Sequence, residues 1–241
     1  MVHIPEKYNS KEEYVHDIFN TIAHRYDLLN TTLSFNRDKY WRRFAVSRCA
    51  LGAGGKALDV CCGTGMLSME LARVMGGTGE VVGLDFSENM LARAELNISK
   101  SPYRGMIRLV QGNAVDLPFP DNTFDCATIG FALRNVPDIG KTIREMARVV
   151  RPGGKVVSLE LSKPGAPVFK QAYYLYFNRL VPILGKLGIG KEGPYSYLPE
   201  SLMAFPHQSE IKDLFDREGL TGTCYHELTG GIATVHEGTV Q

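Results

Sequence analysis

The stretch Leu58-Asp59-Val60-Cys61-Cys62-Gly63-Thr64-Gly65 decides the fold of this chain of 241 residues. It reads as an apolar strand that runs into a glycine turn, and the residues after the turn have the apolar spacing of a helix. Glycines let the backbone pass close beneath a ligand, and the helix start offers free N–H groups. This arrangement favours a bound nucleoside.

The same alternation of apolar runs and helical periods continues outward from this turn. Strands are predicted over 56–60, 80–84, 106–110, 124–129 and 155–161, and helices near 67–75, 88–98 and 139–150. The run Arg151-Pro152-Gly153-Gly154 is predicted to stop the last of these helices. Strands that alternate with helices predict an α/β fold with a parallel sheet covered on both faces.

The two ends of the chain carry further elements of one domain over 1–241. Ser10 and Glu13 have the spacing of a capping box, and the apolar stripe after them predicts a helix that ends near His24. Residues 1–50 are interpreted as a helical cap. Residues 163–206, which are aromatic and interrupted by proline and glycine, are interpreted as an insertion over the active site. A helix over 209–218 and two strands within 224–239 complete the prediction.

Composition excludes several classes of protein. With 27 Lys and Arg against 26 Asp and Glu, the chain has no overall charge that would point to nucleic acid. The charged N-terminus and the lack of a long apolar run predict a protein that is neither exported nor integral to a membrane. Five cysteines without a CxxC pair suggest reduced thiols, and therefore a cytoplasmic location.

Two more polar positions follow predicted strands. Asp85 ends the second strand about 20 residues beyond the glycine turn, where a carboxylate can accept both hydroxyls of a ribose. Asn113 follows the third strand and offers a side-chain amide and a backbone N–H to an adenine. Alone, Asn113 would read as an ordinary turn residue, but the three positions together predict a nucleoside site.

Departures from the dinucleotide pattern indicate which nucleoside is bound. Ser68 stands in place of the third glycine, and Asp59 stands four residues before Gly63. A pyrophosphate gains nothing from a nearby carboxylate, whereas the ammonium and sulfonium groups of S-adenosylmethionine do. We therefore expect S-adenosylmethionine, held by Asp59, Gly63, Gly65, Asp85 and Asn113. A nicotinamide oxidoreductase is the outside alternative.

Further motifs extend along nearly the whole chain. The more particular ones are Leu133-Arg134-Asn135-Val136, Tyr197-Leu198-Pro199-Glu200-Ser201 and Gly230-Gly231-Ile232, and the looser ones include Tyr26-Asp27-Leu28-Leu29-Asn30. On these residues the chain resembles the ubiquinone/menaquinone biosynthesis C-methyltransferases, most narrowly the demethylmenaquinone methyltransferases.

The resemblance implies a fold, a reaction and a set of contacts. The implied fold is the Rossmann-like class I S-adenosylmethionine-dependent methyltransferase, with a mostly parallel seven-stranded sheet. The implied cofactor contacts are Thr64, Asp85, Asn113 and Ala114. Gly130 departs from the pattern, because some relatives have a cofactor-touching serine there. The implied reaction methylates a ring carbon of a polyprenyl naphthoquinol, the last step of menaquinone biosynthesis.

Methylating a ring carbon requires a reduced quinone that has lost a hydroxyl proton. A phenol-like pKa near 10 places that anion about 4 kcal/mol uphill at pH 7. Arg134 is expected to stabilise it electrostatically, with a surface ion pair as the alternative, and Asn135 to hold a water or a ring oxygen. Tyr26 lies where the N-terminal helix can close over the site. No general base is assigned.

The aromatic and basic stretch 168–181 has two interpretations. It is either a groove for a polyprenyl tail, with transient contact to a membrane surface, or a helix packed on the core. No metal site is predicted, because His226-Glu227 and His236-Glu237 lack the HExxH spacing.

Alternatives to the favoured reaction stay open. They are methylation of a benzoquinol in ubiquinone biosynthesis, methylation of another lipid or small aromatic molecule, and a non-catalytic cofactor-binding assembly protein. A homo-oligomer is left open as well.

Overall fold

The structure is a computed structural model that describes residues 4–165 and 193–241. The predicted aromatic stretch 168–181 lies outside the described residues, as does most of the insertion predicted over 163–206. In chain order, the described helices and strands are α1 (Lys11–Ile22), α2 (Tyr26–Leu33), α3 (Asp38–Ser47), β1 (Lys56–Val60), α4 (Met66–Val74), β2 (Glu80–Asp85), α5 (Glu88–Ser99), β3 (Ile107–Gln111), β4 (Phe124–Gly130), α6 (Ile139–Val149), β5 (Val150–Leu161), α9 (Gly193–Ala204), α10 (Gln208–Arg217), β6 (Thr221–Leu228), the short 3-10 helix η2 (Thr229–Gly231) and β7 (Ala233–Thr239).

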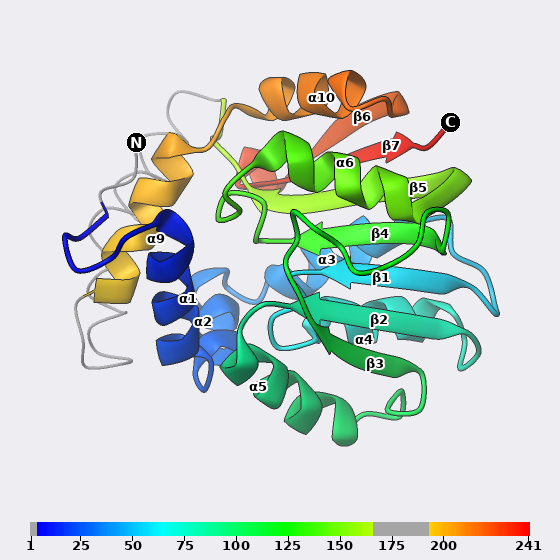
Figure 1. The fold of residues 1–241 in the computed structure, drawn as a ribbon, viewed down its shortest axis with the longest axis horizontal. Coiled ribbons are helices and arrows are strands. Elements are labelled where there is room, and N and C mark those ends of the chain that lie inside the picture. The colour runs from blue at the N-terminus through cyan, green and yellow to red at the C-terminus, as the bar shows by residue number, and fades with distance from the viewer. Residues whose placement is uncertain (1–3, 166–192) are drawn as a thin grey trace.

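The strands form one seven-stranded sheet in the order β3-β2-β1-β4-β5-β7-β6. Strands β1 to β5 pair in parallel, and β7 runs antiparallel between β5 and β6. The predicted mostly parallel sheet is thereby confirmed. In Figure 1 the arrowheads of β1, β2 and β4 point to the end of the molecule where α1, α2 and α9 lie. Side chains that follow these strands therefore gather beneath those helices.

Alternation of side chains along the strands separates two buried clusters. Leu58 and Val60 of β1 pack in a cluster with Met146 of α6 and Phe215 of α10. Ala57 has the opposite parity and packs in a second cluster with residues of α3 and α4. Because successive strand residues point to opposite faces, Asp59 shares the α3 and α4 side with Ala57. That orientation decides what its carboxylate can reach.

The structure adds one packing helix to the predicted N-terminal segment. Helix α3 packs against the sheet: Trp41 is 2% exposed and belongs to the cluster with α4. Its indole nitrogen donates to Thr229 Oγ1 at 2.8 Å. Helices α1 and α2 lie at the end of the sheet to which the parallel strands point (Figure 1). The local sequence gave no apolar stripe strong enough to predict α2 or α3.

The end of α6 differs from the prediction in one respect. The helix stops at Val149, but β5 begins at Val150, so the predicted turn Arg151-Pro152-Gly153-Gly154 lies inside the strand. Pairing of β4 with β5 shifts register between Phe124 and Cys126. Gly153 takes a left-handed φ of 82° there, which a glycine adopts without steric cost. The glycines therefore make an irregular strand rather than a loop.

A third cluster of buried side chains joins the helices over the strand ends. Val15 and Ile18 of α1 pack with Met90 of α5 and Tyr197 of α9. Ser10 caps α1, because its Oγ accepts the N–H of Glu13 at 3.1 Å. Within 4–165 and 193–241, no helix has an apolar stretch long enough to cross a bilayer.

Candidate functional site

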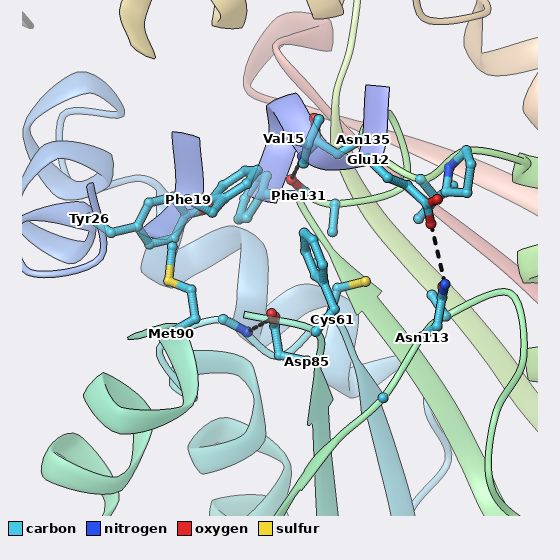
Figure 2. Close-up of a pocket in the computed structure, with 18 residues that line it drawn as sticks. Glu12, Val15, Phe19, Tyr26, Cys61, Asp85, Met90, Asn113, Phe131 and Asn135 are labelled. Carbon is cyan, nitrogen blue, oxygen red and sulfur yellow. Dashed lines mark hydrogen bonds between the residues drawn. The ribbon is translucent and has the colours of Figure 1, made fainter. Parts of the chain in front are cut away.

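A cavity lies between α1 and the carboxyl ends of the parallel strands (Figure 2). It holds about 670 Å³ of empty space, part of which is open to solvent. Its walls combine a few polar groups with many apolar ones. The lining residues are Glu12, Val15, Phe19, Tyr26, Cys61, Gly63, Asp85, Phe86, Met90, Gly112, Asn113, Ala114, Gly130, Phe131, Ala132, Asn135, Val136 and Pro137.

The glycine turn after β1 forms the floor of this cavity. Gly63 has a φ of 55°, and a Cβ added to it would meet no atom within 4 Å. The missing side chain therefore leaves open space against the backbone, as expected where a ligand approaches closely. Gly65 has a φ of 78° and begins α4, but it does not line the cavity. Its role here is to turn the chain.

Asp85 ends β2 with its carboxylate fixed by the backbone. Oδ2 accepts the N–H of Gly63 at 2.8 Å, and Oδ1 accepts the N–H of Ser87 at 2.9 Å. Burial raises the pKa of Asp85, and these hydrogen bonds act in the opposite direction. The side chain is 5% exposed and lines the cavity, so its acceptor oxygens are held in one orientation before any ligand arrives.

Asn113 and Ala114 form the cavity wall after β3. The Asn113 Nδ2 donates to Glu12 Oε1 at 3.2 Å, and the Asn113 Oδ1 accepts the N–H of Val115 at 3.1 Å. The second bond is an Asx-type turn, which is the turn role considered from the sequence. The first, drawn as a dashed line in Figure 2, shows that Glu12 of α1 already binds the amide that was predicted from the sequence to contact an adenine.

Asp59 differs from the prediction. It does not line the cavity: its Oδ2 accepts the Ser68 hydroxyl at 2.6 Å, and its Oδ1 accepts the Thr128 hydroxyl at 3.1 Å. Burial raises the pKa of Asp59 to about 7, although both hydroxyls act to lower it. Asp59 lies outside the cavity because successive residues of β1 point to opposite faces of the sheet, and this position faces α4. Asp59 ties β1 to α4 and β4, and its carboxylate is not part of the cavity lining.

Thr64 also lies behind the cavity wall. Its hydroxyl donates to Asp27 Oδ1 of α2, and its backbone carbonyl accepts from Asn97 Nδ2 at 3.0 Å. Asn97 Nδ2 donates to Asp27 Oδ2 at 3.0 Å as well. The side chain of Thr64 therefore fastens the glycine turn to α2 and α5 instead of facing the cavity.

Arg134 is part of a buried ion pair. Its guanidinium pairs with Glu160 of β5, and its Nη1 donates to the Phe131 carbonyl at 2.8 Å. The backbone N–H of Arg134 also donates to Glu160 Oε2 at 3.2 Å. Burial is the largest single influence and lowers the pKa of Arg134, but Glu160, Tyr26 and Tyr197 together outweigh it, so the pKa is raised. Arg134 does not line the cavity, and its ion pair is buried rather than at the surface.

Asn135 brings a polar group to the wall opposite Asp85. Its Oδ1 accepts the hydroxyl of Tyr197 at 3.0 Å, and its Nδ2 lies 3.4 Å from the Phe131 carbonyl. Tyr26 lines the cavity from α2, as predicted from the sequence, and burial raises its pKa. A phenol with a raised pKa is a poor base at neutral pH.

The sequence predicted that the N-terminal helix closes over the site, but it did not identify which side chains of α1 line the cavity. Glu12, Val15 and Phe19 of α1 line it, together with Cys61 and Phe131. Val15 and Phe19 belonged to the predicted apolar stripe of α1, so the stripe was a usable signal. The position of Glu12 was not foreseeable, because it depends on how α1 docks on the sheet.

Three comparisons place the chain among known proteins. The ubiE/COQ5 methyltransferase family matches residues 7–240. A protein of Desulfitobacterium hafniense (strain Y51) named demethylmenaquinone methyltransferase is 52% identical over 228 residues, which is 95% of this chain and 90% of that protein.

Solved structures are similar in fold at low sequence identity. A SAM-dependent methyltransferase from Thermotoga maritima aligns with a TM-score of 0.65 and 18% identity, and covers 94% of this chain and 100% of that one. A Haemonchus contortus phosphoethanolamine N-methyltransferase in complex with S-adenosyl-L-methionine aligns with a TM-score of 0.59 and 15% identity, over 82% of this chain and 52% of that one. These two similarities concern the fold.

Proposed function

The chain belongs to the ubiE/COQ5 methyltransferase family, and on that premise we propose that it transfers a methyl group from S-adenosylmethionine to a ring carbon of a polyprenyl naphthoquinol. A demethylmenaquinol would thereby become a menaquinol. The observation that carries this proposal is the lining of the cavity, which falls into two groups. Gly63, Asp85 and Asn113, which follow or end parallel strands, are called the first wall. Asn135, Tyr26 and the apolar side chains of the lining are called the second wall.

The first wall has the features that S-adenosylmethionine needs. The cofactor supplies an electrophilic methyl group on a sulfonium. Gly63 leaves room against the backbone, the fixed carboxylate of Asp85 can accept ribose hydroxyls, and Asn113 with Ala114 can receive the adenine. Thr64, Gly65 and Asp59 support this wall from behind. Any attraction between Asp59 and the ammonium group of the cofactor therefore acts through the cavity wall and not by direct contact.

The second wall is suited to an aromatic ring that bears a developing negative charge. The Arg134 guanidinium and the Asn135 amide share one acceptor, because both donate to the Phe131 carbonyl. The positive charge of Arg134 favours the phenolate form of the bound quinol, although the negative charge of Glu160 weakens this effect. Asn135 can turn its amide towards a ring oxygen. Arg134 acts through its charge and by holding the loop, because its raised pKa prevents it from accepting a proton.

The cavity lining limits the choices for proton removal. Its titratable side chains within the described residues are Glu12, Tyr26, Cys61 and Asp85. Burial raises the pKa of Tyr26 and of the Cys61 thiol, so both are neutral near pH 7. Asp85 already accepts two backbone N–H groups, and Glu12 Oε1 already accepts the Asn113 amide. We therefore assign no side-chain base, and the quinol proton leaves to solvent while the bound anion is stabilised by Arg134 and Asn135.

Exposed apolar side chains near the cap support transient contact with a membrane surface. Leu28 of α2 is 67% exposed, and Phe35 just beyond α2 is 76% exposed. A polyprenyl substrate resides in a bilayer, and exposed apolar side chains on the cap would favour contact with that surface. Sedimentation with vesicles should show weak binding that the double variant Leu28→Ser, Phe35→Ser loses.

Labelled methyl transfer tests the proposed reaction. The full chain is incubated with methyl-labelled S-adenosylmethionine and with a short-tailed demethylmenaquinone, either reduced or oxidised. We expect labelled menaquinone with the reduced acceptor only, because the oxidised ring lacks the electron density to attack the methyl group. Preferential labelling of a benzoquinol would move the assignment to ubiquinone biosynthesis. Cofactor binding without turnover on any acceptor would refute the proposed reaction.

A further inference from the structure

Three side chains with metal-binding chemistry meet on the edge of the sheet, away from the cavity. Cys224 and His226 lie two residues apart on β6 and therefore share one face of the strand. Glu237 of β7 lies directly opposite Cys224 in the antiparallel register. Their ligand atoms all lie within 4.8 Å of one another, and none of the three lines the cavity.

The separations between the ligand atoms match those of a tetrahedral ion. The distance is 3.6 Å from Cys224 Sγ to His226 Nε2, 3.4 Å from Cys224 Sγ to Glu237 Oε1, and 2.9 Å from His226 Nε2 to Glu237 Oε1. Metal bonds of about 2.3 Å to sulfur and about 2.0 Å to nitrogen and oxygen, at tetrahedral angles, give edges of roughly 3.5 Å from sulfur to each of the other two donors and roughly 3.3 Å between nitrogen and oxygen. The three donors are therefore preorganised to within a few tenths of an ångström.

We propose that Cys224, His226 and Glu237 bind a zinc-type divalent transition metal ion, with the fourth position open to water. On binding, the Cys224 thiol releases its proton to solvent as the sulfur–metal bond forms, His226 donates the Nε2 lone pair, and Glu237 donates through its carboxylate. The ion replaces the protons that now link the three side chains. A thiolate, an imidazole and one carboxylate form a donor set that selects zinc-type ions over magnesium or calcium.

The surroundings supply the contacts that orient metal ligands. Arg48 at the end of α3 donates from Nε and Nη2 to Glu237 Oε1, each at 2.9 Å, and Lys155 of β5 lies 3.9 Å from Glu237 Oε2. The ring of Phe44 packs against His226 with the ring centroids 5.4 Å apart. The Arg48 side chain is 40% exposed and can turn to Oε2, which leaves Oε1 to the ion. Cationic neighbours weaken such a site without blocking it.

The position of this cluster suggests a structural purpose. β6 is the edge strand of the sheet, and its Cys224 and His226 face the side on which α3 packs. An ion held by both β6 and β7 would link the last two strands, and its stabilisation would add to the folding free energy because the unfolded chain has no preformed site. The cofactor cavity would be unaffected.

Cobalt binding to the full chain tests the site directly. Metal-free protein titrated with Co²⁺ should bind about one ion and develop a thiolate-to-cobalt absorption band with tetrahedral visible bands. Zn²⁺ should remove the spectrum and raise the melting temperature. Cys224→Ser and His226→Asn should abolish the thiolate band and the thermal shift, while they leave S-adenosylmethionine binding unchanged. His24→Asn, which replaces an exposed histidine elsewhere, should behave as the wild type.

A second variant tests whether Arg48 competes with the ion. Arg48→Ala removes a positive charge next to Glu237, so we expect Co²⁺ to bind about fivefold to tenfold more tightly.

Three results would overturn the proposal. A thiolate band that persists in Cys224→Ser would place the ion at another cysteine. Weaker binding in Arg48→Ala, or no Zn²⁺-dependent rise in melting temperature in the wild type, would contradict it as well. None of these results depends on methyl transfer.

Discussion

The two walls of the cavity are assembled in different ways. The wall of Gly63, Asp85, Asn113 and Ala114 consists of residues that each follow a parallel strand, and backbone N–H groups fix its carboxylate. The opposite wall joins Asn135 from the segment after β4 to Tyr26 of α2 and to Tyr197 of α9. One wall follows from the sheet itself, whereas the other exists only when the cap helices are docked.

This difference predicts how the walls respond to change. Substitutions at the strand ends should weaken cofactor binding and leave the rest of the site in place. Substitutions near Arg134 and Tyr197 should disturb packing and turnover together, because the buried ion pair and the α1–α9 cluster support one another. The four variants below test this separation, from the largest expected effect to the smallest.

Arg134→Ala should have the largest effect on stability. It leaves the Glu160 carboxylate, which is 1% exposed, without its buried partner, and such a loss costs about 3–5 kcal/mol. Chemical denaturation measures the free energy of unfolding. The double variant Arg134→Met, Glu160→Met is the control and should recover most of the loss. If the single variant is as stable as the wild type, the ion pair does not hold the second wall.

Asp59 should make stability depend on pH. Its folded-state pKa of about 7 lies above the unfolded value, so its contribution is fully present below about pH 4 and is lost as the pH rises through 7. A difference of about three units corresponds to about 4 kcal/mol. We expect Asp59→Asn to abolish this loss in unfolding measured from pH 4 to 8, whereas Asp213→Asn at an exposed site should not. Parallel curves for Asp59→Asn and the wild type would show that Asp59 is ionised when folded.

Asp85→Asn should weaken S-adenosylmethionine binding by about 30-fold to 100-fold. The change removes the charge that strengthens hydrogen bonds to the ribose, which is worth about 2–3 kcal/mol. Calorimetric titration gives the dissociation constant. Asparagine retains one acceptor for the N–H groups of Gly63 and Ser87, so folding should be affected less than by alanine. An unchanged affinity would remove Asp85 from the cofactor site.

Glu12→Ala should have the smallest effect. It frees the Asn113 amide from its partner on α1, so we expect S-adenosylmethionine to bind up to about threefold more tightly. Glu13→Ala, one position further along the same helix, is the matched control. Weaker binding in Glu12→Ala would mean that Glu12 helps to hold the cofactor.

The sequence predicted the first wall better than the second, for physical reasons. Strand ends and glycine turns have local signals, so Gly63, Asp85, Asn113 and Ala114 were all placed at the cavity. Asp59 was predicted to hold the cofactor but lies outside the cavity lining, because spacing along the chain gave its distance from Gly63 and did not show which face of β1 it occupies. The Thr64 side chain lies outside the cavity because its hydroxyl donates to Asp27, a residue 37 positions away in the sequence.

The second wall depends on contacts that no local pattern encodes. Asn135 and Tyr26 lie at the cavity as predicted, but Arg134 turns away from it to meet Glu160. The hydrogen bond between Tyr197 and Asn135 joins residues 62 positions apart. Helix α2 and helix α3 gain their stability from packing on the rest of the protein, so the sequence of residues 26–47 alone did not reveal them.

The most direct test of the separation between the walls is the Asn135→Ala variant. Its dissociation constant for S-adenosylmethionine and its methyl-transfer rate at saturating cofactor are measured on the same preparation. We predict that the affinity changes by less than about twofold while the transfer rate falls by about tenfold to 100-fold. If instead the affinity for S-adenosylmethionine falls by about tenfold to 100-fold and the transfer rate at saturating cofactor is unchanged, the assignment of Asn135 to the substrate is contradicted.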